Sequence, residues 1–177
     1  MNIVRWSIIT VLGLGVPAAL VAQDRLVARG GGAGFSMTVE ATKQGVFPGG
    51  KGGAIPGLGF SYGLKSPRDA ASGQATGKRQ HGPVVFTKRV GTASPQIFQA
   101  LTSNESLKSV VVNLPAEEGG YTVKLINASI SEIKQYTEIV NGQATVLEDV
   151  SFTFQKIEVQ DPGTKTMAVD DGMLGKI

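Results

Sequence analysis

The sequence of 177 residues contains no cysteine and one histidine. The absence of cysteine excludes disulfides, thiolate catalysis and zinc or iron–sulfur sites with cysteine ligands. His81 lies in a polar stretch without neighbouring carboxylates, and no Gly-x-Ser-x-Gly motif is present to supply a nucleophilic serine. We therefore interpret His81 as a surface residue and expect no enzyme: no catalytic residue, no metal ligand and no bound cofactor.

Aromatic residues and net charge are also scarce. Seven Phe, three Tyr and one Trp stand against 24 Gly, which favours turn-rich β structure over a helical bundle. The formal net charge is +3, and the Lys and Arg residues are spread along the chain. This pattern is typical of a solvated surface and does not predict a nucleic-acid partner. The length fits one domain with a core of its own.

The longest apolar run lies at the N-terminus, and residues 1–22 have the layout of a signal peptide. Arg5 provides the positive start, the apolar run ends at Pro17, and small residues lead to a cleavage site near Ala22. The run is short for a membrane span, so we expect a secreted or periplasmic protein without stable membrane insertion. An uncleaved anchor and a buried helix are the alternatives. Residues 23–34 are rich in glycine and predict a flexible lead-in.

The rest of the chain reads as a β domain over residues 35–160 and a C-terminal tail over 161–177. Apolar and β-branched residues alternate in most of the segments that we interpret as strands. These segments are residues 35–40, 55–64, 84–90, 107–114, 121–136 and 147–159. The apolar phase shifts within 121–136, which predicts a β-bulge. Both parities are apolar in 147–159, which indicates a bulge or burial on both faces. Residues 42–53 and 66–82 predict long exposed loops. The tail has weak amphipathic character, and we expect it to be disordered.

One short helix is predicted after the third strand. Ser94 is a good N-cap, and Pro95 suits the first helical turn because its missing N–H would be unpaired there. Ile97, Phe98 and Leu101 follow at helical spacing. The spacing predicts an α-helix over about residues 94–103.

The residues before this helix and at its start resemble a known sequence signature. Phe86-Thr87-Lys88-Arg89-Val90, followed by Ala93-Ser94-Pro95, resembles the central motif of the Hcp family (hemolysin-coregulated proteins), the tube subunits of type VI secretion. Residues 150–158, with Ser and Phe alternating before Lys-Ile-Glu, are similar to the last strand of that family. The resemblance covers about residues 35–160. It implies a mainly β fold, a β-barrel of two packed antiparallel sheets with one short flanking α-helix.

The resemblance also implies a function and partners. In that family six subunits form a ring, rings stack into a tube, the lumen holds cargo proteins, and a spike protein lies at the tip. We expect the 42–53 loop to reach a neighbouring subunit or ring, with a mobile surface loop as the alternative. The candidate contact residues are Gly45, Phe47, Pro48 and Lys51 in this loop, and Thr87, Lys88 and Arg89 in the signature.

The signal peptide conflicts with part of this picture, because type VI tube subunits assemble in the cytoplasm. Either an Hcp-like protein is exported and assembles outside as a ring or fibre, or the leader is retained or the start codon is misassigned. We favour the first. A secreted monomeric β-barrel that binds a small ligand or glycan is the alternative function.

Overall fold

The computed structural model describes residues 35–115 and 120–171. The predicted signal peptide, the predicted lead-in and the end of the tail lie outside these residues. The elements are β1 (Ser36–Ala41), β2 (Gly45–Val46), the 3-10 helix η1 (Lys51–Gly53), β3 (Ile55–Pro56), β4 (Gly59–Ser61), β5 (Leu64–Lys65), β6 (Gln80–His81), β7 (Val84–Arg89), α1 (Ser94–Thr102), β8 (Leu107–Leu114), β9 (Tyr121–Val140), β10 (Gln143–Thr153), β11 (Lys156–Asp161) and β12 (Thr166–Asp171).

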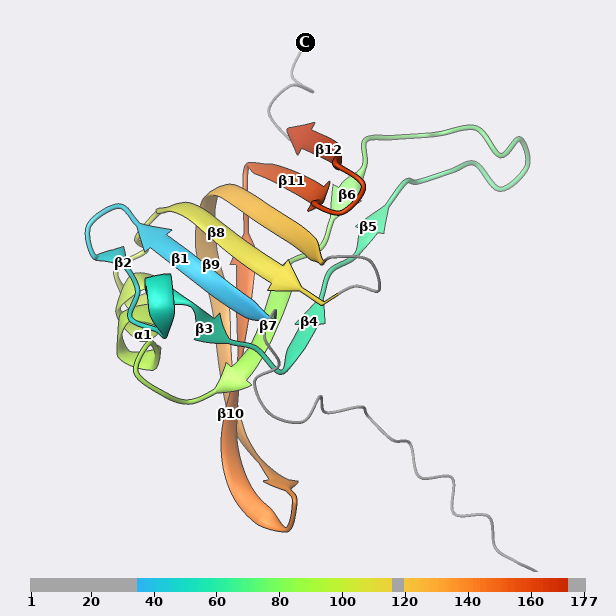
Figure 1. Ribbon diagram of the computed structural model, residues 1–177. Coiled ribbons are helices and arrows are strands. Elements are labelled where there is room, and N and C mark those ends of the chain that lie inside the picture. The colour runs from blue at the N-terminus through green and yellow to red at the C-terminus, as the bar shows by residue number, and fades with distance from the viewer. Residues whose placement is uncertain (1–34, 116–119, 172–177) are drawn as a thin grey trace, which may run out of the picture.

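Two antiparallel layers pack against each other, and α1 covers one end of the space between them (Figure 1). The first layer contains β1, β8, the first half of β9, β11 and β12, with β2 and β3 on the outer edge of β1. The second layer contains the rest of β9, β10, β7 and β4. The prediction of a mainly β fold with two sheets and one short helix is confirmed. Within residues 35–115 and 120–171, no helix has both the length and the apolar character needed to span a membrane.

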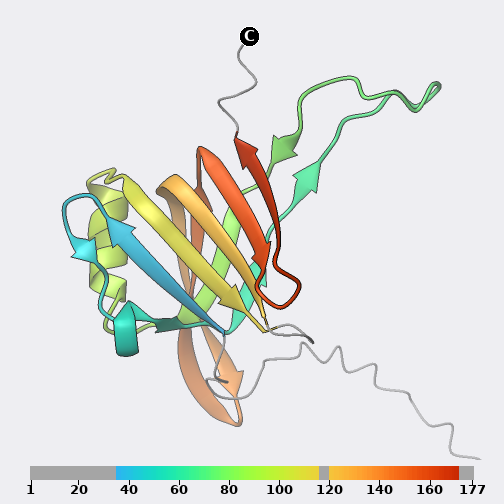
Figure 2. The same ribbon diagram turned by 45° about the horizontal axis from the view of Figure 1, so that its top comes forward.

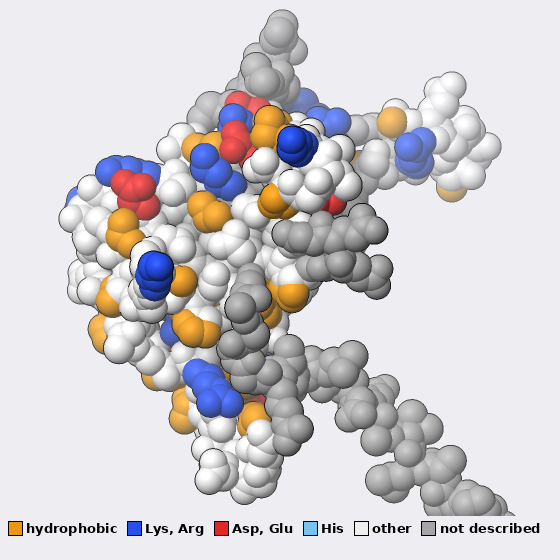
Figure 3. Space-filling view, in the orientation of Figure 1, with side chains coloured by type: hydrophobic (Ala, Val, Ile, Leu, Met, Phe, Trp, Pro, Cys, Tyr) orange, Lys and Arg blue, Asp and Glu red, His pale blue; other side chains and the backbone are white. Residues whose placement is uncertain are grey.

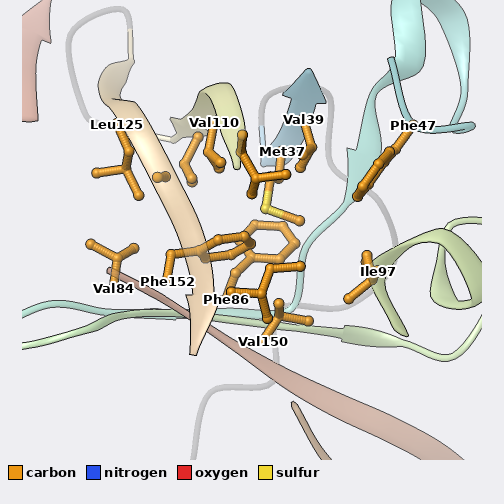
Figure 4. Close-up of a cluster of buried hydrophobic side chains, with 14 of the residues drawn as sticks. Met37, Val39, Phe47, Val84, Phe86, Ile97, Val110, Leu125, Val150 and Phe152 are labelled. Carbon is orange, nitrogen blue, oxygen red and sulfur yellow. The ribbon is translucent and has the colours of Figure 1, made fainter. Parts of the chain in front are cut away.

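Inward-facing side chains of both layers form the core, as alternation along the strands predicts (Figure 4). Met37 and Val39 from β1 meet Phe86 from β7 and Phe152 from β10, and each of these four side chains is fully buried. Ile97 on α1 closes one end of the core. The predicted helical stripe is only partly buried, because Phe98 points to solvent.

Strand β9 explains the phase shift in its sequence. Val123 and Leu125 are buried in its first half, whereas Ala128 and Ile130 are buried in its second half. The parity changes at Asn127, whose φ of 50° lies in the left-handed region, where asparagine is tolerated better than most residues. The register with β10 then slips between Ser151 and Phe152. The predicted bulge is therefore confirmed, and it lies where β9 passes from one layer to the other.

Three predicted segments are folded differently from the expectation. Residues 55–64 form three short strands, β3, β4 and β5, instead of one. Residues 147–159 belong to two strands, because the chain turns a corner at Phe154 and Gln155 and β11 joins the other layer. The two apolar parities there reflect this corner. The tail is not wholly disordered, since β12 pairs with β11 along its full length.

Two parts of the chain project from the body (Figures 1 and 2). One is the ribbon formed by the ends of β9 and β10, which turns at Asn141 and Gly142. The other is a long arm, residues 64–81, which leaves through β5 and returns through β6. In both views the arm and the ribbon point to opposite ends of the molecule.

Candidate assembly surface

The signature segment places a buried ion pair at the junction of β7 and α1. Lys88 shares the inward parity of Val84 and Phe86, and it lies directly opposite Glu148 on β10. Both side chains are almost completely buried, with 2% of Lys88 and 1% of Glu148 exposed. The Lys88 Nζ lies 2.5 Å from the Glu148 Oε1. A charge buried this deeply requires such a partner, because neither group retains water.

Ser94 joins this pair to the start of the helix. Its hydroxyl donates to the Glu148 Oε1 at 2.6 Å and accepts from the Lys88 Nζ at 3.0 Å and the Gly91 amide at 2.9 Å. The Gln135 side chain donates to the other Glu148 oxygen at 2.9 Å. The predicted N-cap role of Ser94 is wrong: Ala93 occupies the N-cap position without a side-chain bond, and Ser94 is the first helical residue. Its hydroxyl instead fixes the connection that precedes α1.

The network holds Glu148 as a carboxylate. Burial acts to raise the pKa of Glu148, but hydrogen bonds from Lys88, Ser94 and Gln135 outweigh burial and lower it. The Lys88 Nζ also donates to the Arg89 carbonyl at 3.0 Å, so Lys88, Ser94 and Glu148 form one bonded network at the junction of β7, β10 and α1.

A hollow, which we call the signature groove, lies beside this network. Its volume is about 390 Å³, and its lining comes from residues 48–50, 55–58 and 88–93. The groove thus brings together Pro48 from the predicted loop and Lys88 and Arg89 from the signature, although about 40 residues separate them in sequence. Its walls are mostly apolar, and Arg89 and Val90 are exposed at its edge.

The structure divides the predicted contact residues into buried and exposed ones. Phe47 and Lys88 are buried, so their side chains support the surface from beneath and do not form it. Thr87 is half-buried on the opposite face of β7, where its hydroxyl donates to the Asp149 carboxylate at 2.6 Å. Exposed side chains in this set are those of Lys51 and Arg89, with Pro48 half-buried. Gly45 is the first residue of β2, directly after a turn, and has a φ of 74°.

The 42–53 segment does not form the long flexible loop that its glycines predict. The Glu105 carboxylate accepts bonds from the Lys43 amide at 2.5 Å and from the Gln44 amide and side chain at 2.9 Å each. Phe47 is buried, and its amide donates to the Val39 carbonyl at 3.0 Å. The segment therefore packs on its own domain. The projecting segment is instead the arm of residues 64–81.

The projecting ribbon carries an apolar surface that the sequence analysis missed. Ile139 and Val146 are 72% and 48% exposed, and Val90 beside them is 42% exposed. Ile139 pairs with Ala144 and Val146 pairs with Thr137, so these four side chains share one side of the ribbon. The Val90 amide donates to the Val146 carbonyl, which continues this side into the edge of the signature groove. We call Val90, Ile139, Ala144 and Val146 the ribbon face. The alternation of apolar residues continues along the strands beyond the core, and this pattern could have revealed the ribbon face from the sequence.

No cluster suited to a metal ion occurs in the described part of the chain, where no three His, Asp or Glu side chains gather. Lys88, Ser94 and Glu148 beside the signature groove are bonded to each other, and the exposed side chains at the groove include those of Arg89, Val90 and Thr92. Such a surface is suited to contact with another protein.

Comparisons with known proteins identify the family and the fold. A sequence model of the family described as "Type VI secretion system effector, Hcp" matches residues 49–160. The "Major exported protein" of Pseudomonas aeruginosa is 40% identical over 123 residues, which cover 64% of this chain and 72% of that protein.

Solved structures show the same fold. A crystal structure of an Hcp protein superposes with a TM-score of 0.68 and 25% identity, covering 79% of this chain and 99% of the other. The secreted protein Hcp3 from Pseudomonas aeruginosa superposes with a TM-score of 0.62 and 30% identity, covering 78% and 97%. From the signature residues, the two-layered fold and these matches, we conclude that the chain belongs to the Hcp family of type VI secretion proteins.

Proposed function

We propose that this protein is a self-assembling structural subunit that forms hexameric rings, and that the rings stack into a tube. The observation that carries the proposal is the ribbon face, an exposed apolar surface on a two-stranded projection that continues into the signature groove. Large exposed apolar side chains grouped on one element are typical of interaction sites.

A closed ring needs one patch that meets a different patch on the neighbouring copy. The ribbon face and the signature groove provide the first patch. Strand β12 is a suitable second patch, because Met167 and Val169 are 64% and 48% exposed and the strand pairs with β11 alone among the described strands. An edge strand offers unpaired backbone groups to an incoming chain. The two patches lie on different elements, as a heterologous contact requires.

The arm is our candidate for the contact between rings. It projects from the end of the molecule opposite the ribbon, and Figure 3 shows Lys and Arg side chains along it. Residues 64–81 contain four Lys or Arg residues and one Asp. This composition keeps the arm solvated until a partner covers it. The arm is thereby a second candidate beside residues 42–53, whose contact with a neighbouring copy stays a prediction.

We further propose that the protein is exported and that its ring lumen carries cargo, with a spike protein as a partner at the tube end. Export is supported by the relative named "Major exported protein", by the structural neighbour described as secreted, and by the signal-peptide pattern of residues 1–22. The role that we propose is structural, and membership of the Hcp family of type VI secretion proteins supports it.

The test is the mass of the protein in solution. Residues 23–177 and the full chain are measured by light scattering behind a sizing column, and the same peaks are imaged by electron microscopy. We expect six-fold rings, with stacks at higher concentration. A monomer at tens of micromolar, which is the range in which a stable interface remains closed, would contradict the proposal.

A second candidate function is a monomeric barrel that binds a small ligand or glycan. One observation favours it: a hollow of about 410 Å³ between the arm base and the C-terminal hairpin, with Tyr62, Tyr121 and His81 in its lining. Aromatic faces and planar polar groups suit sugar rings. If the protein is monomeric, calorimetric titration with oligosaccharides tests this function, and the variant Tyr121→Ala should weaken any binding.

A further inference from the structure

The arm contains few contacts that could fix its own direction. Its two limbs pair only at Leu64 with His81 and at Lys65 with Gln80, and one further bridge joins Arg68 to Ala75. A two-stranded ribbon this short is only marginally stable alone. The direction of the arm must therefore be set at its base, where it leaves the body.

An ion pair ties the base of the arm to strand β12. The Asp170 carboxylate accepts from the Arg79 Nε at 2.7 Å and from the Arg79 Nη2 at 3.1 Å, which is a bidentate geometry. The His81 Nε2 lies 3.4 Å from the same carboxylate. These residues are about 90 positions apart in sequence, and the Asp170 side chain is only 20% exposed. The Arg79 side chain is 63% exposed, so the bidentate geometry rather than burial distinguishes this pair from an ordinary surface ion pair.

Aromatic contacts tie the other limb of the arm to the same place. The Tyr62 hydroxyl lies 2.6 Å from the His81 Nδ1, and the two rings are stacked with centroids 6.2 Å apart. Phe154, at the corner between β10 and β11, packs in a T-shaped geometry against both rings, with its centroid 5.5 Å from that of His81 and 6.2 Å from that of Tyr62. Burial, followed by the charge of Asp170, raises the pKa of Tyr62, so its hydroxyl keeps its proton at neutral pH.

We propose that Tyr62, Arg79, His81, Phe154 and Asp170 form a clasp that sets the direction of the arm, and that Asp170 is its central positioning residue. The 410 Å³ hollow between the arm base and β11–β12 lies beside the clasp, and Tyr62, Arg79, His81 and Asp170 are part of its lining. The C-terminal hairpin thereby controls how the arm is presented to another ring. This last step rests on the proposed function, whereas the clasp itself does not.

The direction of the arm can be measured by distances between spin labels, because the chain has no cysteine of its own. The variants Ala71→Cys on the arm and Gln99→Cys on α1 place the two labels at exposed positions. Pulsed electron resonance on dilute protein, with labelled chains diluted into unlabelled ones, then gives the distribution of distances within one chain. We expect one narrow distribution for the parent protein.

Asp170→Asn retains the size of the side chain and removes its charge. We expect the distance distribution to broaden roughly twofold, because a segment released from its few contacts samples more orientations. The exchanged pair Arg79→Asp with Asp170→Arg should narrow it again. The matched control is Glu158→Gln on β11, because Glu158 pairs with Lys124 and Lys156 and does not contact the arm. An unchanged distribution in Asp170→Asn would overturn the clasp.

Electron microscopy of the same variants separates the clasp from the assembly. If Asp170→Asn forms rings but few stacks, the clasp positions the arm for contact between rings. If the distribution broadens and stacking is unchanged, the positioning role is wrong. If the parent protein forms no rings, the proposed function fails, yet the spin-label result still decides whether the clasp exists.

Discussion

The buried ion pair between Lys88 and Glu148 is the residue-level feature with the largest expected effect on stability. Lys88→Met would leave the Glu148 carboxylate buried without its cation. We expect the free energy of unfolding to fall by about 3–5 kcal/mol, as measured by urea denaturation. Replacing both residues, as Lys88→Met with Glu148→Leu, should recover much of this loss because no charge then remains buried.

The matched control for Lys88→Met is Lys108→Met. Lys108 also forms a cross-strand ion pair, at 3.0 Å from Glu40, but both side chains are largely exposed. Exposed pairs contribute less than about 1 kcal/mol, so this variant should hardly change unfolding. Equal losses in the two variants would contradict the importance of the buried pair.

The same pair predicts a pH dependence. The folded pKa of Glu148 lies below its ordinary value, so the folded protein binds this proton less readily than the unfolded chain does. The resulting stability is fully present above the ordinary pKa of a glutamate and is lost as the pH falls through the lowered folded pKa. Urea unfolding of the parent and of Glu148→Gln along an acidic pH series should show their stability gap shrinking. A gap independent of pH would contradict the assignment.

Sequence reasoning at the residue scale placed Lys88 on the same side of its strand as Val84 and Phe86, and the structure agrees. It could not find Glu148, because that partner lies 60 positions away and nothing local marks the pairing. The same limit applies to His81. We interpreted it as a residue without carboxylates, and the strand that supplies Asp170 begins 85 positions later.

At the scale of elements, the anchoring of residues 42–53 depends on Glu105. Burial acts to raise the pKa of Glu105, but hydrogen bonds from Gln44 and Lys43 lower it, which reflects how fully its oxygens are used. Glu105→Ala removes these acceptors. We expect faster amide hydrogen exchange at Lys43 and Gln44 by mass spectrometry, with β8 still protected. Glu40→Ala, which removes an exposed carboxylate from β1, is the control and should leave the exchange of this segment unchanged.

Strand β9 was predicted well and the strands after it less well, for a common reason. The phase shift in β9 is a local pattern of apolar residues, so it can be read from the sequence. The corner at Phe154 and Gln155 gives nearly the same sequence pattern as a bulge. In both cases the apolar residues shift from one set of alternate positions to the other. Only the pairing of β11 with the first half of β9 distinguishes them. The prediction of one strand over residues 55–64 was wrong, because glycines interrupt the strand pairing that the alternation of apolar residues alone predicts.

At the scale of the whole molecule, the ribbon face predicts where assembly can be blocked. Ile139→Glu puts a charge on a side chain that is 72% exposed in the single subunit and would be covered in a ring. We expect rings to give way to monomers in light scattering, with an unchanged urea midpoint. The control is Gln143→Glu, which adds the same charge to the other side of the ribbon, because Gln143 pairs with Val140. Equal disruption by both variants would indicate a general charge effect.

The family and the fold were accessible from the sequence because the signature is a compact run of residues that performs a local task, the turn from β7 into α1. The candidate assembly surface could be predicted only in part from the sequence. Pro48 and Arg89 were named as contact residues and do line one groove. The ribbon face was not found, because an apolar strand residue looks the same whether a core or a neighbouring copy will cover it.

The passage of β9 through both layers has a mechanical consequence. Its first half is bonded to β8 and β11, and its second half is bonded to β10, within a single strand of twenty residues. A force applied to the ribbon tip along β9 therefore loads the hydrogen bonds of both sheets in shear and at the same time. Hydrogen bonds that are loaded together share the applied force, whereas hydrogen bonds that open one after another each bear the whole force. We therefore expect the protein to be stiff in the direction in which the ribbon projects.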